Sequence, residues 1–418
     1  MIQLGLFLLS CYFIQGQKYQ LYNLTTNKVT TEFFIQKSWL DVIFSPFIDI
    51  ADYFIHFQAY QPQITSWFIW IILAGVILAI KHKKAILILK AFLLFCFLVI
   101  FILFIRYPGN KLVSKNPENI LVDYHSHTYY SWDGMASLER SLAYHKANGF
   151  DAFAITEHDI LHPNIIITED PVIILGEELK GRDNYHLIYN IDKKIDARAL
   201  NHDINRINKK VDEMNGVICA ALWWEHSSFD KLQKKPIDAY EIANMGHRTS
   251  NNINVEKSIN DPRLPKIGTT DWHGWAFRAT IWTAVKIPHW QEMTFKEKQK
   301  SLVHTLKGNY RTQVIEQKRE EVHNNLRYIF EPFIGLFYLL TAKNFINLVS
   351  WFIWIIILTF LYKKKLSWLI LGVTIFSYGL KFFITWYLVS AYNRSLKTVA
   401  ISFIIVGILA VFVALKKR

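Results

Sequence analysis

Apolar residues gather in five long runs, and one long polar stretch separates the second run from the third. The runs are 64–80, 85–105, 345–362, 366–389 and 399–415. Each is close to the ~20 residues that a helix needs to cross ~30 Å of hydrocarbon. Buried helices of a large soluble protein are the alternative, but Lys/Arg clusters at the ends of the runs favour membrane spans. The pattern therefore predicts two transmembrane hairpins, in segments 64–105 and 326–389, and a C-terminal transmembrane helix within 397–415.

Basic clusters predict the orientation of these spans. Short loops rich in Lys and Arg stay on the cytoplasmic side, which places 81–84, 363–365 and 416–418 inside. The polar stretch 110–325 is then extracytoplasmic, and we expect an integral multi-pass protein of the bacterial inner membrane. Three cations close to the second run and an apolar segment at 328–341 oppose this arrangement. We interpret that segment as interfacial, although whether it crosses the membrane stays open, as it does for the apolar N-terminal residues.

Two sequence blocks occur twice. The block SWFIWII stands at 66–72 and again at 350–356, and IFSPFI at 43–48 matches IFEPFI at 329–334. Two Trp/Ile-rich helices can resemble each other by chance, but paired blocks at nearly equal spacing favour a duplicated membrane module. Both copies run in the same direction, so the two halves are expected to enter the membrane in parallel. What the duplication does is not evident from the residues.

Composition agrees with a membrane protein. The 418 residues are 52% hydrophobic and only 19% charged, and the mean hydropathy is +0.15. A wholly soluble enzyme or a disordered chain has a different balance. Three cysteines exclude a disulfide-built secreted domain. The net charge of +13 is concentrated near membrane edges, so we expect the lipid bilayer as a partner and no nucleic acid. Residues 1–63 are expected to form an apolar segment and an interfacial region.

The polar stretch carries candidate metal ligands at the ends of predicted strands. Alternation along a short strand places His125 and His127 on one face, as two ligands of one ion require. A helical pattern from Ser137 to Gly149 and a buried strand at 151–156 follow, and together they predict a βαβ unit whose site lies at the carboxyl ends of the strands. Later strand ends carry further His, Asp and Glu residues, which are His158, Glu178, His186, His226, Glu241, Asp271 and His273. A metal centre explains this recurrence better than scattered core histidines do.

The order of these motifs resembles the polymerase-and-histidinol-phosphatase (PHP) superfamily of metal-dependent phosphoesterases. Its D-x-H-x-H-T motif corresponds to DYHSHT at 123–128, and its T-D-H-type strand end to TEHD at 156–159. A G-x-E follows at 176–178, and TDWH at 270–273 matches the S-D-x-H motif. The block EIAN at 241–244 is similar to the CehA/McbA-like branch. The resemblance covers roughly 120–285 and implies an α/β fold, a distorted (β/α)7-type PHP barrel inserted between the two transmembrane hairpins.

The resemblance also implies a set of metal ligands. The first position would use His125, His127, Glu178 and Asp271; Glu178 would bridge to a second position with His186 and His226; and Asp133, His158 and His273 would form the third. Imidazole and carboxylate ligands suit Zn, Mn or Fe. Some relatives have histidine where this chain has Asp133, so two and three divalent ions both remain open.

The implied activity is hydrolysis of a phosphoester by a metal-activated hydroxide. Glu157, Asp159 and Glu241 are interpreted as groups that orient the histidines. Five basic residues near strand ends are candidates for contacting phosphate, with a solvated surface role as the alternative: Lys180, Arg182, His247, Arg248 and Arg278. Four tryptophans near the motifs suggest an aromatic rim, with ordinary packing as the alternative: Trp223, Trp224, Trp272 and Trp275.

Three functions stay open at this point. Membrane anchoring suggests that a phosphoester substrate is lipid-linked or part of the cell envelope. The same metals can instead hydrolyse a non-phosphate ester, an amide or a carbamate. The third alternative is a membrane sensor or scaffold that binds metal without turnover. The substrate, the metal and the oligomeric state are not specified by the sequence.

Overall fold

The computed structural model divides the chain into two compact units. We call Met1–Tyr19, Ser38–Pro108 and Arg319–Arg418 the helical unit, and Gln20–Lys37 with Gly109–Lys318 the sheet unit. The structure describes residues 7–8, 10–11, 13, 20–53, 61–104, 109–163, 168, 170–182, 184–222, 224, 228–247, 253–275, 278–308, 311–318, 325–341, 343–362, 364–389 and 393–415.

This division differs from the sequence-based one in the first 63 residues. Gln20–Lys37 joins the sheet unit instead of lying on the membrane surface, because β1 (Gln20–Asn23) pairs antiparallel with β13 (Thr312–Lys318). A second short pairing, of β3 (Phe33–Gln36) with β4 (Lys111–Ser114), ties the same segment to the start of the polar stretch.

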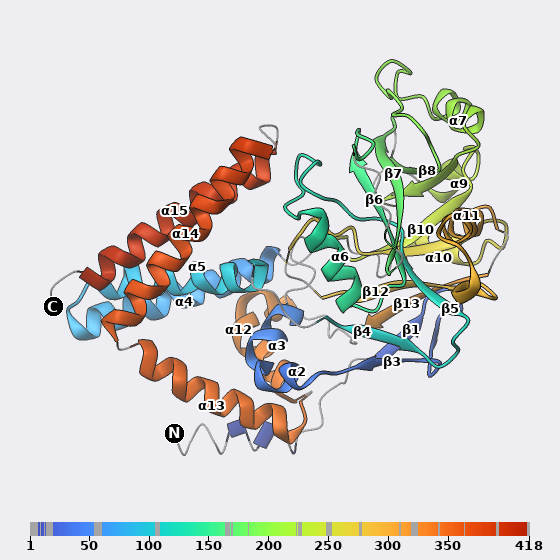
Figure 1. Cartoon of the computed structure of the whole chain (residues 1–418). Helices are drawn as coiled ribbons and strands as arrows, with labels where there is room; N and C mark the ends of the chain where they lie inside the picture. Colours follow the sequence, from blue (N-terminus) through green and yellow to red (C-terminus); the bar gives the residue numbers. More distant parts are fainter. Residues whose placement is uncertain are drawn as a thin grey trace. The chain divides into compact units, whose positions relative to one another are not determined.

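The sheet unit is built on one mixed sheet of 11 strands in the order β11-β10-β9-β8-β7-β6-β5-β12-β13-β1-β2. An α/β fold, as predicted, is therefore present (Figure 1). The strands not yet bounded are β2 (Lys28–Val29), β5 (Asn119–Asp123), β6 (Ala152–His158), β7 (Val172–Lys180), β8 (Tyr185–Tyr189), β9 (Val217–Ala221), β10 (Ala239–Asn244), β11 (Lys266–Thr269) and β12 (Ile281–Lys286).

Seven of these strands, β5 to β11, form a segment whose two ends meet. Strands β5, β6 and β7 are parallel, β8 is antiparallel to both of its neighbours, and β9, β10 and β11 are parallel. Just beyond β11, the backbone N–H of Asp271 donates to the carbonyl of His125 at 2.9 Å. The N–H of His127 donates back to the carbonyl of Trp272 at 2.8 Å. These bonds place the residues after β11 directly beside the residues after β5.

Helices of the sheet unit follow local sequence signals. The helix α6 (Leu138–Ala147) begins at Ser137, whose side chain accepts a hydrogen bond from the Arg140 N–H. It ends before Gly149, which adopts a left-handed φ of 84° that favours glycine. The remaining helices are α7 (Ile204–Glu213), α9 (Phe229–Leu232), α10 (Ile253–Ile259), the 3-10 turn η1 (Trp290–Glu292) and α11 (Phe295–Thr305).

Among its described residues, the helical unit contains three helical stretches long and apolar enough to cross a membrane: Ile64–His82, Ser367–Tyr387 and Arg394–Leu415. Shorter apolar stretches are Ile86–Ile100 and Phe345–Leu361. The helices of this unit are α2 (Trp39–Ile43), α3 (Ser45–Tyr53), α4 (Gln61–His82), α5 (Ile86–Phe104), α12 (Asn325–Thr341), α13 (Phe345–Tyr362), α14 (Lys365–Val389) and α15 (Arg394–Leu415). Membrane association follows from the length and composition of these helices.

The two copies of the repeated blocks contact each other reciprocally. Trp70 Nε1 of the first copy donates to the carbonyl of Ile329 at 2.7 Å, and Trp354 Nε1 of the second donates to the carbonyl of Ile43, also at 2.7 Å. A serine four residues before each tryptophan donates to the same carbonyl, at 2.9 Å in both cases. In each copy, the tryptophan and the serine therefore donate hydrogen bonds to a backbone carbonyl of the other copy.

A matching backbone break exposes the two accepting carbonyls. Phe44 has φ −101° and ψ 22°, and Phe330 has φ −105° and ψ 21°, so each lies outside helical geometry. A proline follows two residues later in both copies, at Pro46 and Pro332, and it cannot supply the backbone N–H that a continuous helix needs. The sequence repeat thus corresponds to a structural repeat of the helical unit.

Replacing either of these two tryptophans, each of which donates to the other copy, should lower the stability of the helical unit to the same degree. Trp70→Phe and Trp354→Phe each remove one donor, and we expect each to lower the free energy of unfolding by about 1 kcal/mol. Unfolding by SDS in mixed micelles measures the change. Trp39→Phe, at a tryptophan that is 75% exposed, is the matched control. Unchanged stability in both variants would contradict a stabilising role for these reciprocal hydrogen bonds.

Candidate metal centre

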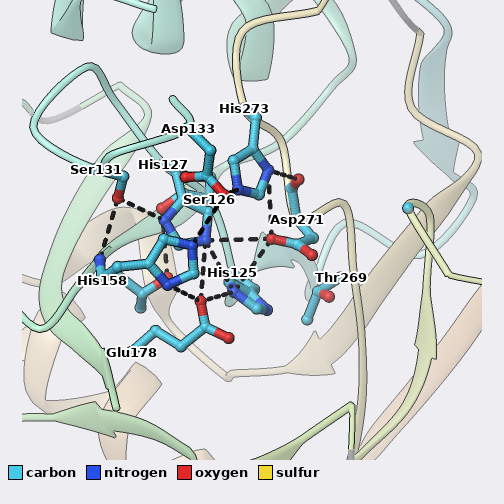
Figure 2. A network of polar contacts seen from close by, with 12 residues as sticks. His125, Ser126, His127, Ser131, Asp133, His158, Glu178, Thr269, Asp271 and His273 are labelled. Carbon is cyan, nitrogen blue, oxygen red and sulfur yellow. Dashed lines mark hydrogen bonds and ion pairs between the residues drawn. The ribbon is translucent and has the colours of Figure 1, made fainter. Parts of the chain in front are cut away.

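Four candidate ligands converge where the two ends of the β5–β11 segment meet. His125 and His127 lie two and four residues after β5 ends, Asp271 lies two residues after β11 ends, and Glu178 lies inside β7 (Figure 2). The sequence predicted that Glu178 lies at the end of a strand. The observed strand continues to Lys180, because pairing with β8 extends it.

Five pairs of ligand atoms from these residues lie 3.0–3.3 Å apart, the two carboxylate oxygens each lying close to both imidazole nitrogens. We call these atoms the four-donor group: Nε2 of His125, Nε2 of His127, Oε2 of Glu178 and Oδ1 of Asp271. His125 Nε2 lies 3.0 Å from His127 Nε2, 3.2 Å from the Glu178 oxygen and 3.2 Å from the Asp271 oxygen. His127 Nε2 lies 3.3 and 3.2 Å from the same two oxygens. An ion with ~2.0–2.1 Å bonds to tetrahedral ligands separates them by about 3.3 Å. The donor set and its spacing therefore fit a divalent cation.

Three further residues form a second, more open group beside the first. This outer group consists of Asp133, His158 and His273. The Asp133 Oδ2 atom lies 3.3 Å from Nε2 of His158 and 3.3 Å from Nε2 of His273. Its other oxygen, Oδ1, is buried without a hydrogen-bond partner among the described residues, as expected of a ligand atom without its ion. Nδ1 of His158 lies 3.0 Å from Glu178 Oε2, which joins the two groups.

The two groups differ in exposure. The side chains of His125, His127 and Glu178 are at most 2% exposed, whereas those of Asp133, His158 and His273 are 13–20% exposed. A set of three imidazoles, from His127, His158 and His273, also has donor atoms within 4.8 Å of one another. Buried donors hold an ion firmly, and partly exposed donors leave room for a further ligand. The centre can therefore hold metal and remain open on one side.

Glu241, which the sequence predicts to orient a histidine, lies next to the ring of His125. Its Oε1 lies 3.2 Å from His125 Nδ1, on the side of the ring away from the four-donor group. The other oxygen accepts the backbone N–H of Leu222 at 2.9 Å, and the Thr269 hydroxyl donates to Oε1. A carboxylate in this position fixes the ring orientation of a metal-binding histidine.

Glu157 acts on His127 through Ser131. The Ser131 hydroxyl donates to Glu157 Oε2 at 2.6 Å and lies 2.9 Å from His127 Nδ1. Glu157 also accepts from the Thr128 N–H at 3.1 Å. The orienting role predicted for Glu157 is thus indirect, and Ser131 is the intermediate that the sequence reading missed.

Asp123 is a second residue whose role the sequence reading missed. This fully buried carboxylate accepts the N–H of His125 at 3.2 Å and the N–H of Thr270 at 3.0 Å. Its Oδ2 lies 3.0 Å from His145 Nε2 of α6. Asp123 therefore fixes the backbone on both sides of the four-donor group. The sequence could have indicated this role, because Asp123 is the first residue of the DYHSHT motif that contains both histidines.

The electrostatics of the metal-free centre favour charged side chains. Burial disfavours the imidazolium of His125, but the carboxylates of Asp271 and Glu178 outweigh burial and hold its pKa well above the ordinary value. Burial opposes ionisation of these carboxyls too, yet the imidazoles hold the pKa of Glu178 and of Asp271 well below the usual range. At His273, burial is outweighed mainly by Asp133, which raises the pKa to about 9. Protons thus occupy nitrogen atoms that an ion would use.

His186 does not join the centre, contrary to the expected second metal position. Residues directly opposite in an antiparallel pair point to the same face, and His186 is opposite Leu179. Leu179 is next to Glu178 on β7 and therefore points to the other face of the sheet. The expected partner of His186, His226, lies outside the described residues.

Two other predicted site residues have different surroundings from those expected. Asp159 is exposed, and it contributes its backbone N–H, which donates to the carbonyl of Glu178 at 2.9 Å. Arg278 is only 8% exposed and donates from Nη2 to Asn110 Oδ1 at 3.2 Å, so it is not placed as an exposed phosphate contact. Arg248 lies outside the described residues.

The expected aromatic rim is only partly described. Trp272 is buried and stacks on Tyr144 with ring centroids 4.1 Å apart, and Trp224 is also buried, so both pack in the interior. Trp223 lies outside the described residues. The aromatic residue exposed at the centre is Trp132, which is 52% exposed and stacks on His158 with centroids 5.5 Å apart.

Protein families and curated proteins offer no match to guide the assignment. No protein-family model matches the chain, and no curated protein matches it. The metal centre is therefore argued from the residues of this chain.

Neighbouring glutamates on β7 provide a matched test of metal binding. Glu178→Gln removes a donor of the four-donor group and should reduce the bound metal at least tenfold. Glu177→Gln is the control, because Glu177 points to the opposite face and burial raises its pKa to about 7, where a neutral side chain is tolerated. Elemental analysis of both purified proteins measures the metal content. Equal metal in the two variants would contradict the ligand assignment.

Metal affinity should increase with pH up to about 9. An ion must displace the protons of the imidazoles, and His273, with its pKa of about 9, is protonated at pH 7 in the metal-free protein. Binding therefore releases protons, which titration calorimetry in buffers of different ionisation enthalpy measures. In the metal-free protein the same raised pKa stabilises the fold below the unfolded value of ~6.5, and this stabilisation is lost as pH rises through about 9. Binding at pH 7 without proton release would contradict this electrostatic description.

Proposed function

We propose that the protein is a membrane-associated, metal-dependent hydrolase of phosphoesters with a PHP-type catalytic domain. The observation that carries the proposal is the close approach of the four-donor group, with five interatomic distances of 3.0–3.3 Å among buried imidazoles and carboxylates. The motif order supports a PHP-type domain, and so does the meeting of β5 and β11 at one end, which suits a distorted seven-stranded barrel.

Two divalent ions fit this centre better than three. The four-donor group offers one set of ligands, and the outer group offers a second set, which lies next to Glu178 through His158. The expected second position depended on His186, whose place opposite Leu179 directs its side chain to the other face of the sheet. Nitrogen and oxygen donors without thiolate suit Zn, Mn or Fe.

In this proposal, some residues orient the metal ligands and another contacts the substrate. Divalent ions, when bound, supply positive charge for a phosphoryl group and lower the pKa of a water molecule toward neutrality. Glu241 and the Glu157–Ser131 pair hold the imidazoles of His125 and His127 in one orientation. Lys180 is exposed and lies two residues beyond Glu178 on the same face of β7, so it offers a cation for a substrate phosphate.

The helical unit is proposed to anchor this activity to a membrane. Three membrane-capable helices and the basic clusters favour an integral multi-pass protein of the bacterial inner membrane, arranged as two hairpins and a C-terminal span. The same clusters favour an extracytoplasmic catalytic domain. A lipid-linked or envelope phosphoester is the substrate class that such a location supports.

A substrate panel tests the proposed activity. His125→Ala and Asp271→Ala should each lower aryl phosphate hydrolysis at least a hundredfold, because each removes a donor of the four-donor group. His289→Ala and Asp230→Ala are matched controls, since both side chains are about three-quarters exposed. Hydrolysis of aryl carbamates but not phosphates would replace the phosphoester assignment. Absence of any metal-dependent hydrolysis would favour a metal-binding sensor.

A further inference from the structure

A cavity of about 190 Å³ lies beside the turn between β7 and β8. Its walls come from that turn, from the residues that begin α7, and from the segment after α9. The lining residues are Arg182, Asn184, His186, His202, Asp203, Ile204, Asn205 and Lys235. In Figure 1, α7 lies near the ends of β7 and β8 where this cavity is formed.

The cavity is on the opposite face of the sheet from the metal centre. His186 points away from Glu178, as its pairing with Leu179 requires. Ile204 packs with Leu179 in the apolar layer under α7, so the cavity borders that outer layer. A ligand held here is separated from the four-donor group by the β7–β8 pair. The cavity is therefore separate from the candidate metal centre.

Hydrogen bonds across the cavity walls hold its shape. His202 Nδ1 lies 2.5 Å from the carbonyl of Lys180, and the Arg182 N–H donates to the carbonyl of His202 at 3.1 Å. Arg182 Nε donates to the carbonyl of Asn201 at 3.1 Å. These bonds fix the turn after β7 to the loop before α7, and so the cationic side chain of Arg182 is positioned in advance.

The donors of the cavity suit an oxyanion. Arg182 and Lys235 carry permanent positive charge, and the first turn of the ten-residue helix α7 presents the positive end of its dipole. The carboxylate of Asp203 is engaged at 2.9 Å by the N–H of Asn205, as the N-cap of that helix. The lining therefore contains two cationic side chains, Arg182 and Lys235, and one carboxylate, Asp203, which already accepts a backbone N–H.

An independent observation points to a missing ligand. Asn184 is only 5% exposed, and its side-chain amide nitrogen has no hydrogen-bond partner within the described part of the chain. A buried donor without an acceptor costs about 1–3 kcal/mol, so such groups are normally satisfied. An oxyanion in the cavity would supply the acceptor for Asn184.

We propose that this cavity is a second, non-catalytic binding site for a phosphate-bearing ligand. Phosphate is favoured over a carboxylate because its higher charge and larger number of acceptor oxygens match two cations together with an amide donor. The site acts independently of the metal centre. Free phosphate and the phosphate of a lipid headgroup share this chemistry.

Titration calorimetry on the full-length protein in detergent, with metal removed by EDTA, tests the proposal. The probes are inorganic phosphate and glycerol 3-phosphate, and the preferred probe distinguishes free phosphate from a headgroup. Arg182→Gln/Lys235→Gln should weaken binding at least tenfold, and Asn184→Ala should weaken it severalfold. Arg206→Gln/Lys209→Gln is the matched control, because both residues are exposed on α7 and do not line the cavity.

Two further measurements distinguish failure of this proposal from failure of the proposed hydrolase function. Asp271→Ala should bind phosphate as the wild type does, so a failed hydrolase assignment would leave this site intact. The cavity variants should retain wild-type metal content, which shows that the sheet unit is folded. Absence of binding by the wild type to either probe, or equal binding by the folded cavity variant and the wild type, would overturn the proposal.

Discussion

The backbone pairing between the residue after β5 and the residue after β11 is the constraint on which the metal centre depends. Asp271 and His125 are far apart in sequence, and two backbone hydrogen bonds of 2.8–2.9 Å bring their strand ends together. Asp123 reinforces the pairing by accepting from both sides of it. Without that contact, the imidazoles of β5 would have no carboxylate from β11. The topology of the sheet thus brings together the side chains that could hold a metal ion.

The centre shows why ligand types at strand ends are predictable but their exact partners are not. His125, His127, Glu178 and Asp271 were identified from the sequence, because carboxyl ends of neighbouring strands meet at one edge. His186 was misplaced, because a single antiparallel strand changes which alternating side chains face the centre. Ser131 has no motif of its own, and its contact with His127 depends on loop geometry that spacing does not reveal.

In the fold, too, local features were predictable from the sequence, whereas contacts between distant segments were not. Apolar runs and capping residues were sufficient to predict the long helices and α6, since length and local hydrogen bonds determine them. Gln20–Lys37 was assigned to the membrane surface, because its pairing with β13 joins segments nearly three hundred residues apart. The reciprocal contacts of Trp70 and Trp354 were likewise invisible, although the repeated blocks themselves were plain. Non-local pairing, rather than local propensity, accounts for these errors.

X-ray absorption at the metal edge tests the central claim most directly. The account predicts a first shell of nitrogen and oxygen only, at ~2.0–2.1 Å for zinc, with outer-shell scattering from imidazole rings. A sulfur shell near ~2.3 Å, or a water-only shell without imidazole scattering, would show that the ion binds elsewhere and would contradict the centre described for His125, His127, Glu178 and Asp271.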